Sequence, residues 1–376
     1  MKKNIELKIE NIKKDSAKRK SNIELLRFIL CIFIVMIHLG GIYNYVAPLI
    51  YCSVPTFALI TGFFLYNKED NYAGLKFIPT IIFFIVLNLI VTLILNATTS
   101  SLSNINWLVL VTYGPGQFWY IWAMFFTLLI SPILVLGVKQ LPKYTSLFII
   151  FVFYITMNLP AVGEHINIYI IDRNWYGNIF VIITAFMLGA WMNKYLSDTF
   201  LTNKKKVINY CLPILVILVS IQIVAYAIIK NKVVTNDHNA VLYQLLNNIK
   251  KLSTQNNFPL TILVAFCIFS LFYILNIPYN KFINYLGKAS MIFFVAHFTI
   301  RDWIDSNLMQ KWEIETYSVK RDLISLSLTI AICGSLSLIV IPTYSSYMKQ
   351  FNKSIIYIKT KIKFYSKRNS ISQDVK

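Results

Sequence analysis

The feature that most constrains this chain is a series of ten long apolar runs. A membrane-spanning helix needs roughly 20 apolar residues, because it rises about 1.5 Å per residue through a hydrocarbon layer about 30 Å thick. The runs are too uniformly apolar for the alternating strands of a membrane β-barrel. The sequence therefore predicts an all-α, polytopic transmembrane bundle of about ten spans. These are 23–43, 48–66, 77–97, 117–138, 144–160, 177–193, 207–229, 257–277, 282–300 and 322–345.

The composition excludes a water-soluble enzyme. Of the 376 residues, 57% are hydrophobic and 14% are charged, and the mean hydropathy is +0.60. Soluble domains contain about 45–50% apolar and about 25% charged residues, so this chain in water would expose large apolar patches. The five cysteines are scattered through apolar runs without a CxxC pair. We interpret them as core thiols and predict no disulfide and no metal site.

The net charge of +20 is concentrated at the two ends of the chain. Of 36 Lys and Arg residues, eight lie in 1–20 and eight in 349–376. With both termini in the cytoplasm, ten spans leave 25 Lys and Arg inside, nine outside and two within spans, as the positive-inside rule requires. We therefore predict a cell-membrane protein in contact with membrane lipid. It has a basic tail at 1–20, a membrane domain at 21–345 and a second basic tail at 346–376. No folded basic face indicates nucleic-acid binding.

Ionisable residues within the predicted spans are the candidate functional residues, since such groups are costly in a membrane. The first span contains Glu24, Arg27 and His38, and the ninth contains Lys288 and His297. Glu24 and Arg27 are three residues apart and can pair. Arg27 and His38 are eleven apart, which is close to three helical turns, so they project from nearly the same face about 16 Å apart along the axis. This face predicts a site that handles an anion and moves a proton.

Each of these residues also has a structural interpretation. Glu24 and Arg27 can be an interfacial ion pair that orients the end of the helix. His38 and His297 can be polar contacts between helices, and Ser290, seven residues before His297, permits close helix approach. Lys288 fits an interfacial position. The sequence alone leaves these alternatives open.

Several motifs occur in the order found in a known family. The first span has Glu24, Arg27, a ten-residue gap and His38, and later spans contain VPTFALITGFFL, FWYIWAMF, FMLGAW and LGKASMIFFVAH. This ordered set, from about Asn22 to Ile341, resembles membrane acyltransferase family 3, the ten-span bacterial O-acyltransferases that act on cell-surface polysaccharides. One motif departs from the family: two arginines before the third span correspond to Ala73 and Lys76 in AGLKFIP. Lysine lacks the planar fork of arginine, so anion binding there differs in detail.

The resemblance implies an acyl-CoA donor, most often acetyl-CoA, as a substrate and no permanently bound cofactor. The charged residues fit such a donor. We expect Arg27 and Lys76 to bind its phosphates, Glu24 to orient or neutralise Arg27, and His38 to be the general base or, alternatively, to carry the acyl group. Trp119, Tyr120 and His297 are expected on the acceptor side, although Trp119 and Tyr120 also fit an interfacial aromatic belt.

The implied acceptor is a hydroxyl of a surface glycan or a lipid-linked oligosaccharide. Acetyl and succinyl donors are not distinguished. Some relatives carry an extra-membrane hydrolase-like domain. We predict none here, and we expect either direct transfer or the use of a separate transferase partner. The alternatives are a polysaccharide or lipid-linked glycan exporter without acyl transfer, and a membrane scaffold or sensor. Only the acyltransferase would release CoA.

Overall fold

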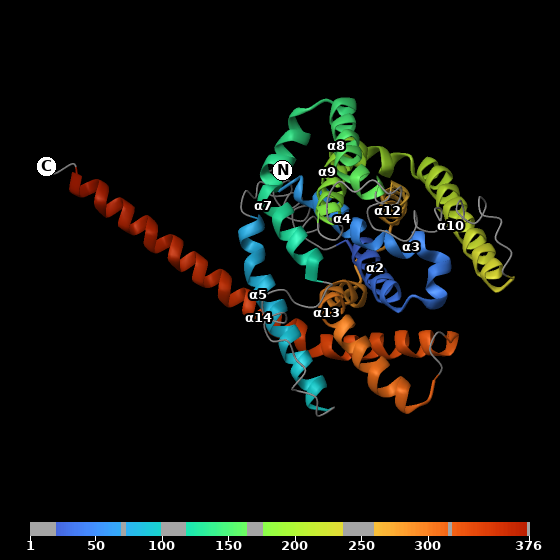
Figure 1. Ribbon diagram of the computed structural model, residues 1–376. Coiled ribbons are helices and arrows are strands. Elements are labelled where there is room, and N and C mark those ends of the chain that lie inside the picture. Colours follow the sequence, from blue (N-terminus) through green and yellow to red (C-terminus); the bar gives the residue numbers. More distant parts are fainter. Residues whose placement is uncertain are drawn as a thin grey trace.

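The computed structural model describes residues 20–68, 73–98, 118–163, 176–235, 259–314 and 318–373. Within these ranges the chain is helical and contains no strand, which confirms the predicted all-α class. Among the described residues, eight helical segments are long and apolar enough to cross a membrane, one of them made of three consecutive short helices. Two shorter apolar helices, at Lys143–Thr156 and Leu260–Ile274, coincide with the fifth and eighth predicted spans. The structure is therefore a polytopic helical bundle (Figure 1).

The elements follow the predicted runs closely. They are α2 (Ser21–Leu39), the 3-10 helix η1 (Gly41–Val46), α3 (Ala47–Tyr51), α4 (Ser53–Leu65), α5 (Ala73–Ala97), α7 (Trp119–Gln140), α8 (Lys143–Gly163), α9 (Tyr176–Thr202), α10 (Lys204–Thr235), α12 (Pro259–Ile274), α13 (Lys281–Trp303), the π-helical η5 (Ile304–Met309) and α14 (Val319–Gln373). The second predicted span is divided into η1, α3 and α4. α14 runs on through much of the predicted C-terminal tail and projects away from the bundle (Figure 1).

We call the end of the bundle where α2 begins the Lys20 end, and the end where α2 stops the Gly40 end. At the Lys20 end, the Asn22 side-chain amide donates to the carbonyls of Phe272, Tyr273 and Leu275 at the end of α12. The last carbonyls of a helix have no partner within the helix, so Asn22 satisfies them. The ring of Phe200 in α9 lies 6.5 Å from that of Tyr273. The start of α2 and the ends of α9 and α12 are therefore close together.

Two basic turns also lie at the Lys20 end. The Lys194 ammonium of α9 donates to the carbonyls of Val138, Lys139 and Leu141, at 2.8 to 2.9 Å, where α7 ends. The Tyr195 hydroxyl donates to the Leu141 carbonyl at 2.6 Å. The turn from α7 to α8 and the turn from α9 to α10 thus share the end where α2 begins. Both turns were predicted on the same side of the membrane.

The helix α2 lies between the two hydrophobic clusters of the bundle. Leu26 and Leu30 of α2 belong to a cluster formed mainly with α4, α9 and α12. Cys31 and Val35 belong to a second cluster, formed with α5, α13 and α14. All five cysteines are buried and unbridged. The residues of α2 that the sequence marked as functional are therefore held between the two clusters.

Candidate functional site

The first charged pair is formed within α2. The Arg27 guanidinium lies 2.8 Å from the Glu24 carboxylate, and the Glu24 side chain is buried whereas that of Arg27 is 29% exposed. This confirms the pair predicted from the three-residue spacing. It lies near the Lys20 end, where the Lys20 ammonium is 4.8 Å from the centre of the Tyr273 ring. Burial lowers the pKa of Lys20.

The helix α13 lies very close to α2 beside this pair. A side chain at Gly287 would overlap the Glu24 side chain and lie 2.9 Å from its Cα, so only glycine allows the two helices to come so near. One turn further on, the Cys31 thiol donates to the Ser290 carbonyl at 3.1 Å. Ser290 was expected to permit close helix approach, and it does lie at the α2–α13 contact. Lys288, on the same helix, is exposed, as expected for an interfacial cation.

Two imidazoles meet at the other end of the same helix pair. α2 is continuous from Ser21 to Leu39, so the Arg27–His38 spacing keeps both side chains within about 20° of one direction. The ring centres of His38 and His297 are 5.1 Å apart, with a tilt of 37°. The rings of Phe298 and His38 are nearly perpendicular, at 89°, and their centres are 5.3 Å apart. The structure therefore brings together two histidines that are 259 residues apart in the sequence.

Backbone carbonyls fix the protonation pattern of His297. Its Nδ1 lies 2.7 Å from the Phe293 carbonyl and 3.1 Å from the Phe294 carbonyl. A carbonyl oxygen only accepts hydrogen bonds, so Nδ1 carries the hydrogen and Nε2 of the neutral ring is an acceptor. His297 is fully buried, and no group in the described residues hydrogen-bonds to its Nε2. The imidazole next to His38 thus has one acceptor atom that is buried and without a partner among the described residues.

A cation lies beside His38. The Arg301 guanidinium, one turn after His297, donates to the backbone carbonyl of His38 and to the Asp302 carboxylate. It also lies 4.7 Å from the centre of the Phe298 ring. The last carbonyls of α2 have no partner within the helix, so Arg301 supplies one for His38. Sequence reasoning placed Arg301 in an outer segment and missed this role. The available signal was the spacing: Arg301 follows His297 by four residues, so the two side chains lie on the same face of a helix.

A second residue missed by sequence reasoning is Asp322, at the start of α14. Its carboxylate accepts a hydrogen bond from the Ile42 amide at 3.0 Å, directly after the glycines at which α2 ends. Gly40 and Gly41 have φ values of +65° and +52°, and a Cβ at Gly41 would overlap the Asp322 carboxylate. Glycine adopts such φ values at little cost. The double glycine following His38 was the signal for this tight turn.

A small cavity lies between α4, α5, α7 and α13. Its volume is about 130 Å³, and Tyr120, Ser290 and Phe294 line it, together with Phe57, Phe77, Phe84, Ile121 and Met291. The Ser290 carbonyl holds the Cys31 thiol, and the Phe294 carbonyl holds His297. Tyr120 is within electrostatic range of Arg27, and its ring lies 5.1 Å from that of Phe294. Two residues of its α13 wall, Ser290 and Phe294, therefore connect the cavity to α2 and to His297.

The remaining predicted site residues take the following places. Trp119 is the first residue of α7, and its ring lies 6.1 Å from that of Tyr120. Lys76 lies exposed in the first turn of α5, next to Phe77, which lines the small cavity. No group of three or more His, Cys, Asp and Glu side chains in the described residues is arranged to hold a metal ion. The roles predicted for Trp119, Tyr120 and Lys76 stay predictions.

The fold and this site define a class: a polytopic helical membrane protein with paired histidines and a charged pair on one central helix. Comparison with known protein families identifies the class further, because the family described as "Acyltransferase domain" matches residues 20–347. The chain belongs to this acyltransferase family, as its motifs indicated. The match supports an acyltransferase activity in general. No curated protein and no solved structure matches the chain.

Proposed function

We propose that this protein is a membrane O-acyltransferase. It moves an acyl group, most often acetyl, from cytoplasmic acyl-CoA to a hydroxyl of a cell-surface or lipid-linked polysaccharide. The observation that carries the proposal is the arrangement along α2. Arg27, paired with Glu24, lies near one end, and His38, beside the buried His297, lies near the other. A small cavity is lined by Ser290 and Phe294 of α13, the helix that packs against α2 and carries His297.

The donor enters from the Lys20 end, which faces the cytoplasm. Support comes from the basic turns at that end, since positive loops are retained on the cytoplasmic side. The phosphates of acyl-CoA bind Arg27 and Lys76, both near the starts of their helices. Glu24 holds Arg27 in place. The thioester then lies in the small cavity between Tyr120 and Phe294, whose volume of about 130 Å³ suits a short acyl group.

His38 acts as the general base on the acceptor hydroxyl. The hydroxyl oxygen attacks the thioester carbonyl while its proton passes to the His38 imidazole. The carbon–sulfur bond then breaks, and the departing CoA thiolate takes that proton. The Nε2 atom of His297 accepts a hydrogen bond from a neighbouring hydroxyl of the same sugar and so orients the acceptor, because the single hydrogen of the attacking hydroxyl goes to His38. Arg301 holds the backbone carbonyl of His38 and so keeps the base in place at the end of α2.

Replacing His38 tests the proposal. Membranes containing the His38→Ala variant are given acetyl-CoA and the isolated surface glycan, and both CoA release and O-acetyl groups are measured. We expect a loss of about 10²–10⁴-fold, the usual contribution of a general base. His238→Ala, at a histidine predicted to lie outside the spans, is the matched control and is expected to keep its activity.

Two outcomes would count against the proposal. Acetylation at the wild-type rate by His38→Ala, at equal protein level, would exclude His38 as the base. Glycan export without CoA release by the wild-type protein would favour the exporter. Parallel assays with succinyl-CoA identify the donor, because the two thioesters differ in size and charge.

A further inference from the structure

A second and larger cavity lies on the other side of the bundle from the paired histidines. Its volume is about 410 Å³, and its walls come from α8, α9 and α12. All of its lining side chains except Thr184 and Tyr154 end in apolar groups or in the Trp191 indole. The lining consists of Leu147, Ile150, Phe151, Tyr154, Ile155, Thr184, Leu188, Trp191, Leu196, Ile262, Leu263 and Phe266. Such a surface fits a hydrocarbon ligand and offers little to a sugar or a nucleotide.

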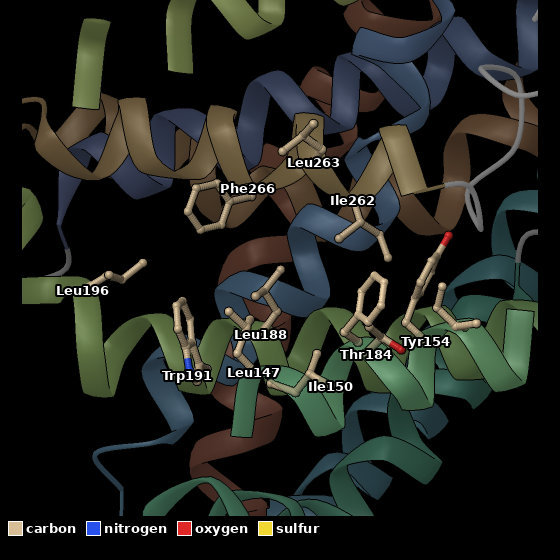
Figure 2. A pocket seen from close by; sticks show the side chains of 12 residues that line it. Leu147, Ile150, Tyr154, Thr184, Leu188, Trp191, Leu196, Ile262, Leu263 and Phe266 are labelled. Carbon is tan, nitrogen blue, oxygen red and sulfur yellow. The ribbon is translucent and has the colours of Figure 1, made fainter. Parts of the chain in front are cut away.

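The cavity is elongated along the helix axes. Figure 2 shows Leu196 and Trp191 at one end, Leu188 in the middle, and Thr184 and Tyr154 at the other end. From Thr184 to Leu196, α9 rises about 18 Å, somewhat more than half of a hydrocarbon layer about 30 Å thick. The length therefore matches one leaflet. Leu263 is 39% and Phe151 58% exposed, so the walls are open towards the surrounding bilayer.

Positive charge is concentrated at one end of this cavity. The Trp191 indole donates to the Lys143 carbonyl at 3.0 Å, so the first residue of α8 lies at the Leu196 end. Lys194 is two residues before Leu196, and its ammonium is held by three carbonyls of α7 and the following turn. Beyond them, α10 begins with Lys204, Lys205 and Lys206, all of which are exposed. An anion at this end would be attracted by several cations.

We infer that this cavity binds one acyl chain of an anionic glycerophospholipid, with its headgroup at Lys143 and the lysines that begin α10. The apolar walls hold the chain, and the length of the cavity sets the chain in a single leaflet. The neighbouring lysines select an anionic headgroup over a zwitterionic one. Nothing in the acyl-transfer proposal uses this site, so either proposal can fail without the other.

Photolabelling tests the inference on the full-length protein in lipid nanodiscs. The probe is phosphatidylglycerol with a photoreactive acyl chain, diluted into phosphatidylcholine. A phosphatidylcholine probe with the same chain is run in parallel. Labelled peptides are identified by mass spectrometry, and we expect them in α8, α9 and α12. This readout needs no enzymatic activity.

Two variants with matched controls make the test specific. Leu263→Trp fills the cavity and is expected to lower labelling roughly tenfold, whereas Ile217→Trp, on the exposed face of α10, leaves it unchanged. Lys143→Gln is expected to weaken the preference for phosphatidylglycerol about fivefold, since one lysine contributes about that much at an anionic surface. Lys349→Gln, at an exposed position of α14, is its control. If Leu263→Trp does not fold, Leu147→Trp fills the cavity from the opposite wall.

Three results would overturn the inference. One is equal labelling by the two probes, which would show that the lysines do not select the headgroup. Another is full labelling of a folded cavity-filling variant. The third is displacement of the probe by a polyprenyl phosphate more readily than by phosphatidylglycerol, which would make the occupant an isoprenoid carrier lipid.

Discussion

At the scale of single residues, the site depends on what surrounds His38. His38 contacts His297 and Phe298, and its carbonyl is held by Arg301. The sequence predicted the Glu24–Arg27 pair and the shared face of Arg27 and His38 because both follow from spacing on one helix. It predicted neither the meeting of His38 with His297 nor the roles of Arg301 and Asp322. Those contacts join residues more than 250 positions apart, and the local signals, the spacing of Arg301 from His297 and the double glycine after His38, do not say which distant residue is the partner.

The role of His297 can be separated from simple packing. His297→Leu keeps an apolar side chain of similar reach but removes the Nε2 acceptor. We expect acyl transfer to fall about 10–100-fold, because the acceptor loses its hydrogen-bond partner. The amount of folded protein is expected to stay the same, because leucine fills the buried position of His297. CoA release by purified protein is the measurement. Unchanged release by a folded His297→Leu protein would assign the residue to packing alone.

At the scale of helices, small residues set how closely the elements approach. A Cβ at Gly62 of α4 would overlap the Phe186 carbonyl of α9, and a Cβ at Gly189 of α9 would overlap the Leu59 carbonyl of α4. The two helices therefore contact each other through their backbones. The helices themselves were predictable because a long apolar run has few alternatives in a membrane. Which helices pair was not predictable, because a glycine in the sequence does not by itself mark a helix contact: nothing packs against Gly137, for example.

Two glycines offer a direct test of this contact. Gly189→Ala is expected to lower thermal stability in detergent by several degrees, because the added methyl group forces α4 and α9 apart. Gly137→Ala in α7 is the control, since a Cβ there would have no atom within 4 Å. Alanine favours a helix over glycine by about 1 kcal/mol, so the control is expected to match or exceed the wild-type stability. Equal effects of the two changes would show that the α4–α9 contact adapts without cost.

At the scale of the whole molecule, the two basic turns of the described chain lie at the same end of the bundle. The basic turns before α8 and α10 lie at the end where α2 begins. The all-α class was predictable from hydropathy alone. The number of spans and the side of the membrane on which the termini lie follow from counting runs and charges, and both stay predictions.

Reporter fusions decide the orientation. We expect green fluorescent protein fused after Lys376 to fluoresce and alkaline phosphatase at the same position to be inactive, because the flanking lysines and arginines are retained in the cytoplasm. Fusions within 301–321, predicted to be outside, are expected to give the opposite pair of results. An active phosphatase at the C-terminus would mean an odd number of spans or an inverted protein.

The backbone contact between α4 and α9 also has a consequence during synthesis. The contact joins two glycines separated by 127 positions, and α9 ends 137 residues after α4. At 5–20 residues per second, a ribosome needs on the order of 10 s to make that stretch. Throughout this interval α4 is already made but α9, the helix that packs against its backbone, is not. A nascent chain stopped before α9 would therefore be a ready target for quality-control proteases, and early termination should leave no stable fragment.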